Sequence, residues 1–261
     1  MSIVLTEDRG RVRHVVLNRA EKRNAMNAEL LLAAKEALVQ AAADPDVHVV
    51  VLRGEGPMFS SGVDLTELAA GAGGGGRSQL RHFRELFLDV PNTAERMTKP
   101  VICQIQGGCI GGALEVALGC DFRVASADAL VGLPEVRLGL IPDVGGSSRL
   151  PALVGLGRAK ELIMTGKLIP AEEGERIGLI TRTAPADGLD DAVGALVDEL
   201  LQCAPIAVGL AKRVMDASAR PALSTTLEQE VTAQEICVAS EDFAEAAQAF
   251  MAKRQPVFAG R

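Results

Sequence analysis

The stretch from Pro100 to Cys120 reads PVICQIQGGCIGGALEVALGC and combines a strand pattern, a glycine turn and a helix pattern. Its first residues, PVICQI, are apolar and partly β-branched, as in a parallel strand that is buried on both faces. Paired glycines follow at 107–108 and 111–112, and an apolar helix pattern begins at the second pair. A strand followed by a turn and a helix predicts an α/β fold in which helices cover the faces of a sheet.

Glu115 is the only charged residue in this stretch. Burial of a carboxylate is costly unless the group has a partner or a function. Two further acids stand alone in the same way, Glu135 in ALVGLPEV (129–136) and Asp143 in LGLIPDVGGSS (138–148). Any one of them could be a helix-capping or turn acid. Three lone acids beside glycine turns predict a site for acid/base chemistry.

The rest of the first half alternates strand and helix patterns. Residues 3–6 and 12–18 predict an antiparallel pair joined by the turn Glu-Asp-Arg-Gly. Asn27 is the expected N-cap of a helix that ends at Asp-Pro, and residues 47–53 (VHVVVLR) form a second buried parallel strand. Helical crossovers of this length between strands are typical of parallel sheets.

The second half is expected to become helical. Residues 69–76 (AAGAGGGG) are a low-complexity insert that we expect to form a wall of the pocket, and a helix is predicted from Ser78 to Met97. Strand patterns stop near residue 190. We therefore divide the chain into a core of residues 1–195 and a helical region of residues 196–261 that serves packing or oligomer contacts.

Composition excludes several classes of protein. The net charge is −7, and Trp and Tyr are absent, so we expect no nucleic-acid partner. Five cysteines without a CxxC pair indicate reduced thiols in a cytoplasmic protein with no metal site. We expect no membrane association, because Glu115 interrupts the best apolar run.

Two glycine-flanked segments follow the predicted strands, FSSGVDL at 59–65 and GGCIGG at 107–112. Ligands of open α/β sheets bind at this strand-to-helix position. Glycine lets backbone amides approach a ligand closely, and amides at a helix start stabilise developing negative charge. Paired N–H donors beside carboxylates suit a reaction that passes through an enolate.

The chain resembles the enoyl-CoA hydratase/isomerase (crotonase) family over nearly its full length. The segments that carry the resemblance are 17–27, 59–65, 99–126, 133–155 and 246–261. The resemblance implies a spiral of ββα units with a helical C-terminal trimerisation region. It also implies a homotrimer or dimer of trimers, an acyl-CoA thioester substrate and no cofactor beyond the coenzyme A of that substrate.

The same resemblance implies roles for individual residues. The backbone N–H groups of Val63 and Gly112 would form an oxyanion hole for the thioester oxygen. Glu115 and Glu135 would add water across the 2,3 double bond of a 2-enoyl-CoA. The residues expected to bind the substrate and its coenzyme A are Ala25, Ser61, Gly62, Asp64, Leu65, Gly111 and Lys253.

Two features depart from the hydratase pattern. Ala113 and Leu114 precede Glu115, where hydratases generally carry a further glycine and a cysteine, and Asp143 replaces a small residue. An aspartate eight residues after the second glutamate resembles dienoyl-CoA isomerases, which would use Glu135 and Asp143, although those enzymes usually carry Asp at the position of Glu115.

We expect a hydratase, because both of its glutamates are present, and dienoyl-CoA isomerase is the alternative. A non-catalytic acyl-CoA-binding member is a further alternative, but a binder needs neither acid. A thioester hydrolase or dehalogenase would use Asp143 as a nucleophile.

Overall fold

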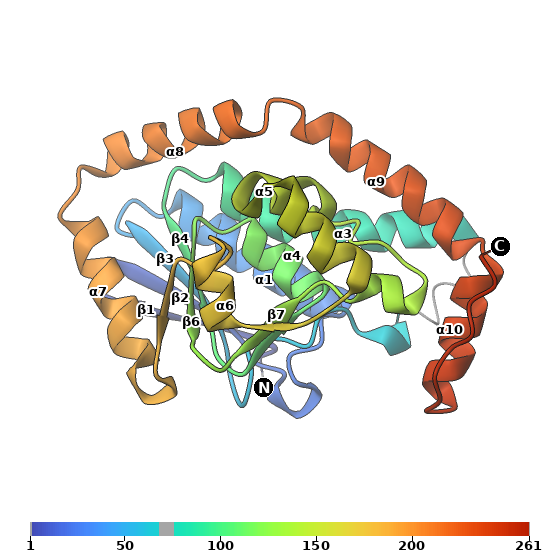
Figure 1. Cartoon of the computed structure of the whole chain (residues 1–261). Helices are drawn as coiled ribbons and strands as arrows, with labels where there is room; N and C mark the ends of the chain where they lie inside the picture. Colours follow the sequence, from blue (N-terminus) through green and yellow to red (C-terminus); the bar gives the residue numbers. More distant parts are fainter. Residues whose placement is uncertain (1, 68–75, 261) are drawn as a thin grey trace.

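The computed structural model describes residues 2–67 and 76–260, and its strands form two sheets (Figure 1). The larger sheet has the order β1-β2-β3-β4-β6-β9. These strands are β1 (Val4–Arg9), β2 (Val12–Leu17), β3 (Val49–Gly54), β4 (Val101–Ile105), β6 (Phe122–Ser126) and β9 (Arg182–Ala184). The first two strands are antiparallel, and each later pair of neighbours is parallel.

The smaller sheet contains β5 (Gly108–Ile110), β7 (Leu130–Gly132) and β8 (Ile169–Pro170). The chain passes from β4 of the larger sheet to β5 of the smaller one and then into α4 (Gly112–Leu118). It repeats this path from β6 to β7. An isolated bridge between Ser60 and Cys109 also joins the segment after β3 to β5. The predicted spiral of ββα units is therefore confirmed.

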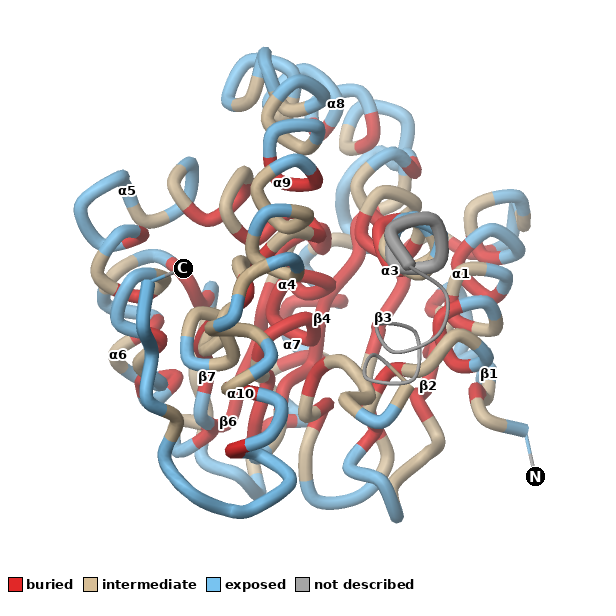
Figure 2. Tube along the Cα trace, turned by 90° about the vertical axis from the view of Figure 1, so that its right-hand side faces the viewer, coloured by how far each residue is buried: buried red, intermediate tan, exposed pale blue. Residues whose placement is uncertain are grey.

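Helices pack on both faces of the larger sheet. The helices of the core are α1 (Ala28–Ala43), α3 (Gly76–Arg96), α5 (Gly146–Thr165) and α6 (Ala171–Arg176). Every residue of α4 is buried, and Figure 2 shows this helix with the strands at the centre of the molecule. Alternate residues of β3 enter two apolar clusters, Val50 and Leu52 on one face and Val49 and Val51 on the other.

The C-terminal part is helical, as predicted. It contains α7 (Leu189–Leu201), α8 (Pro205–Ala219), α9 (Leu223–Val238) and α10 (Glu241–Met251). Helix α7 covers the face of the sheet that carries Val49 and Val51, whereas α8 and α9 arch over the body of the molecule (Figure 1). The division into 1–195 and 196–261 stays a prediction, and residue 195 lies inside α7.

The local predictions differ from the structure at one turn. The turn between the first strands is shorter than Glu-Asp-Arg-Gly, because β1 continues to Arg9 and pairs residue by residue with β2. An ion pair of 2.7 Å between Arg13 and Asp8 stabilises the extension across the two strands. The predicted N-cap is confirmed, since the Asn27 side chain accepts a hydrogen bond from the Leu30 N–H. The glycine insert at 69–76 lies outside the described residues except for Gly76, where α3 begins.

In the described part of the chain, no single helix is long and apolar enough to cross a membrane, and α7 and α8 meet that criterion only as a pair bent by 104°.

Candidate active site

Glu115 lies in the first turn of α4 and is 2% exposed. Its Oε1 accepts hydrogen bonds from the N–H groups of Val144, at 2.9 Å, and Gly146, at 2.8 Å. Both donors belong to the loop before α5. Burial, together with the negative charges of Glu135 and Asp143, raises the pKa of Glu115 well above its ordinary value.

Glu135 begins a short 3-10 helix (Glu135–Leu138) after β7. Its Oε2 is buried and finds no hydrogen-bond partner among residues 2–67 and 76–260. A Cβ at Gly111, where φ is +59°, would lie 2.8 Å from Glu135 Oε1, so the glycine makes this close approach possible. Burial raises the pKa of Glu135 to about 8. The group is therefore mostly protonated at neutral pH.

Asp143 is held by Arg84 of α3. The Arg84 Nε donates to the Asp143 backbone oxygen at 2.8 Å and lies 3.3 Å from Oδ2. Burial raises the pKa of Asp143 to about 7, and the positive charge of Arg84 opposes this rise. The side chain thus titrates close to neutral pH.

The two expected oxyanion donors lie on neighbouring segments. The Met26 N–H donates to the Gly62 oxygen at 2.8 Å, and the Met26 backbone oxygen accepts from the Asp64 N–H at 2.9 Å. Because Val63 lies between these two bonds, its own N–H faces away from Met26. A Cβ at Gly62 would lie 3.4 Å from the Gly112 nitrogen. Within the described residues, neither the Val63 nor the Gly112 amide has a hydrogen-bond acceptor. Both amides are therefore available to a ligand.

These groups meet on one cavity of about 90 Å³. Of the predicted site residues, it is lined by Val63, Gly112, Glu115, Glu135 and Asp143. The rings of Phe83 and Phe87 add an apolar wall, with their centroids 6.1 Å apart. The cavity therefore combines two unpaired amides, three carboxyl groups and apolar surface.

The family model for enoyl-CoA hydratase/isomerase matches residues 7–261. The chain belongs to the enoyl-CoA hydratase/isomerase family. It is 36% identical to the enoyl-CoA isomerase/hydratase fer4 of Mycosarcoma maydis, over 96% of this chain and 93% of that one. It is 35% identical to the short-chain-enoyl-CoA hydratase of Clostridium acetobutylicum, over 97% and 95% of the two chains.

Solved structures show the same fold. An enoyl-CoA hydratase from Mycobacterium avium subsp. paratuberculosis superposes with a TM-score of 0.87 at 28% identity, over 98% of both chains. The family and the crotonase-like architecture predicted from the sequence are therefore confirmed.

The other residues that the family resemblance pointed to lie outside the lining of this cavity. Ala25 and Asp64 share a partner, since Arg19 donates to the Ala25 oxygen at 2.8 Å and pairs with Asp64 at 2.7 Å. The Gly62 oxygen accepts from the Met26 N–H. Ser61, Leu65 and Gly111 lie in the segments next to Val63 and Gly112. Lys253 is exposed just after α10, apart from the cavity that the described residues form. Coenzyme A binding by these residues stays a prediction.

Sequence analysis missed two charged residues of the site, Arg84 and Glu230. Glu230 of α9 is 4% exposed and accepts hydrogen bonds from the Gly145 N–H at 2.9 Å and the Ser148 hydroxyl at 2.5 Å. Its helix reads LSTTLEQEVTAQEICV, in which Glu228 and Glu230 look alike. The sequence therefore carries no local signal for the buried member of this pair.

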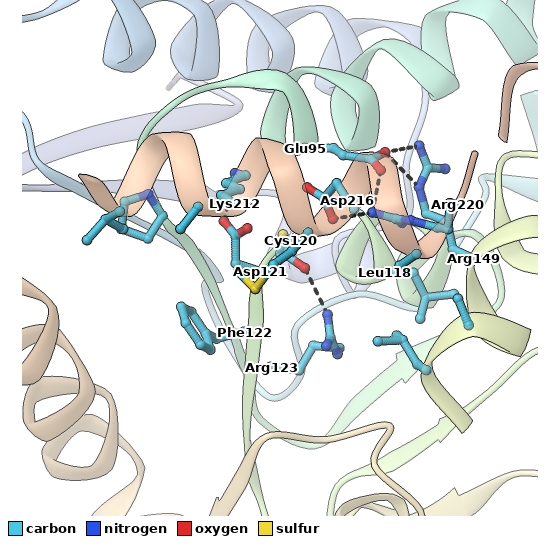
Figure 3. A pocket seen from close by; sticks show the side chains of 18 residues that line it. Glu95, Leu118, Cys120, Asp121, Phe122, Arg123, Arg149, Lys212, Asp216 and Arg220 are labelled. Carbon is cyan, nitrogen blue, oxygen red and sulfur yellow. Dashed lines mark hydrogen bonds and ion pairs between the residues drawn. The ribbon is translucent and has the colours of Figure 1, made fainter. Parts of the chain in front are cut away.

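A larger cavity, of about 380 Å³, lies under α8 (Figure 3). None of the predicted site residues lines it. Charged side chains that line it form ion pairs with one another. Glu95 lies 2.6 Å from both Arg149 and Arg220, and Lys212 lies 2.7 Å from Asp121. The pairs made by Lys212 of α8 and by Arg220 at its C-cap connect this helix to the core and indicate a structural role.

The described residues contain no cluster of three or more His, Cys, Asp or Glu side chains suited to a metal ion. Cys103, Cys109 and Cys120 are buried, and burial raises the pKa of the Cys103 and Cys109 thiols. Cys109 is therefore a small apolar core residue.

Proposed function

We propose that the protein is an enoyl-CoA hydratase that adds water across the 2,3 double bond of a 2-enoyl-CoA. One observation carries the proposal. Glu115 and Glu135 line the same cavity as the unpaired amides of Val63 and Gly112. The name of the Clostridium acetobutylicum relative supports the same activity and the choice of a short-chain substrate.

In the proposed mechanism, the thioester oxygen accepts hydrogen bonds from the Val63 and Gly112 N–H groups. As water adds to C3, negative charge moves onto this oxygen and an enolate forms. Amides that are already oriented stabilise this charge, and each such donor is typically worth about 3 kcal/mol. Gly112 is also the first residue of α4, where the helix dipole favours negative charge.

The two glutamates divide the proton transfer. Burial raises the pKa of Glu115, and its two backbone hydrogen bonds oppose this rise and favour the ionised form. We assign Glu115 as the base that takes a proton from water. Glu135, with a pKa of about 8 and an unpartnered Oε2, is the acid that delivers a proton to C2. An O–H bond of water, the O–H bond of Glu135 and the π bond between C2 and C3 break, while C3–O, C2–H and Glu115 O–H bonds form. Proton exchange with water returns both glutamates to their starting states. The chemistry requires no cofactor beyond the coenzyme A of the substrate.

Dienoyl-CoA isomerisation is the second candidate, because Asp143 also lines the cavity and has a pKa of about 7. Glu135 and Asp143 would then move a proton between distant carbons of the substrate. The name of the fer4 relative includes both an enoyl-CoA isomerase and a hydratase activity. We favour hydration because Arg84 already neutralises Asp143, whereas Glu115 and Glu135 carry no ion pair in the described structure.

A non-catalytic role is disfavoured on energetic grounds. Glu135 keeps a buried oxygen without a partner, and Glu115 is buried beside further carboxyl groups. Both features cost stability, and a protein that only binds acyl-CoA gains nothing from them.

We further propose a homotrimer or a dimer of trimers. Ile206, Leu210 and Val214 follow one another at helical spacing on α8, and all three are exposed. A second copy of the chain would cover this apolar stripe. The free cysteines favour a cytoplasmic location.

The deciding experiment treats purified protein with crotonyl-CoA and with a 3,5-dienoyl-CoA in parallel. Absorbance follows loss of the conjugated thioester of crotonyl-CoA, and gain of a conjugated 2,4-dienoyl thioester from the 3,5-dienoyl-CoA. Mass spectrometry measures the mass of each product. Faster formation of a product heavier by one water supports the hydratase. Isomerisation of the dienoyl-CoA without water uptake would instead support the isomerase and refute the hydratase. A protein inert towards both substrates would refute the two enzymatic proposals together.

A further inference from the structure

Glu230 is a buried carboxylate that the proposed chemistry does not use. It comes from α9, which packs against α5, and its oxygens accept from the Gly145 N–H at 2.9 Å and the Ser148 hydroxyl at 2.5 Å. Arg84 Nη2 lies 3.9 Å from its Oε2. A side chain from the C-terminal helical region therefore reaches the loop that holds Glu115.

The hydrogen bonds of this loop alternate between two carboxylates. The amides of Val144 and Gly146 donate to Glu115, and the amide of Gly145 between them donates to Glu230. Gly145 has φ +105°, and a Cβ there would lie 1.7 Å from Arg149 Nη1. Glycine is thus required for the backbone to present three successive amides in this way.

We propose that Glu230 is a positioning residue for Glu115. By holding the central amide, it fixes the orientation of the two flanking amides that hold the Glu115 Oε1. The inference rests on the proposed function, in which Glu115 is the base. Arg84 supports the same arrangement, because it donates to the Asp143 oxygen at 2.8 Å and to the Leu227 oxygen of α9 at 2.7 Å.

Two variants separate a role in positioning from a role of charge. E230Q keeps the length of the side chain and an oxygen for the Gly145 N–H, while its amide can donate to the Ser148 oxygen. E230D keeps the charge but is one methylene shorter. We expect E230D to lose about 10- to 100-fold in kcat with little change in KM, while E230Q stays close to the wild type.

E228Q is the matched control, since Glu228 is exposed on the same helix and the substitution removes the same charge. It should leave kcat unchanged. Thermal unfolding verifies that each variant is folded. Wild-type kcat in E230D overturns the inference, and so does a loss in E230Q that equals or exceeds the loss in E230D, because charge would then be the decisive property.

Amide hydrogen exchange tests the inference without turnover. In wild type and E230Q, the amides of residues 144–146 should exchange slowly, and in E230D they should exchange faster. Equal exchange in all three proteins overturns the positioning role. If the wild type acts on neither thioester, the proposed function fails, whereas the exchange pattern still decides the role of Glu230 in holding this loop.

Discussion

Replacement of Glu135 by glutamine should stabilise the protein in a strongly pH-dependent way while it abolishes most activity. Burial moves the pKa of Glu135 from 4.5 to about 8. A carboxyl group with a raised pKa in the folded state lowers stability as pH rises from the unfolded value to the folded one. E135Q stays neutral throughout this window and removes that cost.

The pKa values set the size of the effect. Over this window, linkage predicts that E135Q raises the free energy of unfolding by under about 1 kcal/mol at pH 5, about 3 kcal/mol at pH 7 and about 5 kcal/mol above pH 9. Loss of a general acid should lower kcat by about 10²- to 10⁴-fold. E135Q should therefore lose activity and gain stability, because the burial that destabilises the ionised carboxylate also keeps Glu135 protonated for its role as an acid.

Urea unfolding of wild type and E135Q at pH 5, 7 and 9 measures the gain, at one protein concentration so that any assembly contributes equally. E21Q is the control, since Glu21 is exposed and should show no pH-dependent gain. A gain that is the same at pH 5 and pH 9, or a loss of stability at pH 9, would refute the electrostatic argument for Glu135.

Three further predictions address the neighbours of Glu135. G111A places a Cβ 2.8 Å from Glu135 Oε1 at a position with φ +59°, so kcat should fall by about 10²-fold. Steady-state kinetics measure the loss, and circular dichroism verifies that the variant is folded. R84Q removes the cation that opposes the raised pKa of Asp143, so this pKa should rise above about 7. Carboxyl ¹³C NMR of labelled aspartates measures the pKa, and comparison with D143N assigns the signal. D143N itself should retain crotonyl-CoA hydration and lose any dienoyl-CoA isomerisation; if hydration is lost instead, Asp143 belongs to the hydratase machinery.

The parts of the site that the sequence predicted are those with a local signature. The strand–glycine–helix order around Glu115 is contained in one stretch, and the isolation of Glu115 and Glu135 among apolar residues is visible without a fold. The oxyanion segments were found because glycine-flanked turns follow strands. These features depend on neighbours in the sequence, and the sheet then brings them together.

The missed features depend on contacts between distant segments. The partners of Glu115 lie 29 and 31 residues further along the chain, and Glu230 meets Gly145 across 85 residues. Both Arg84 and Glu230 come from helices rich in polar residues, where a buried charge resembles a solvated one. Only packing reveals which charge points inward.

The bridge between Ser60 and Cys109 joins the two segments that carry the expected oxyanion amides, although 48 residues separate them along the chain. This pairing therefore sets the spacing of the two amides directly, whatever path the chain takes between Ser60 and Cys109. The geometry for an enolate is a property of the backbone and needs no side chain at either donor.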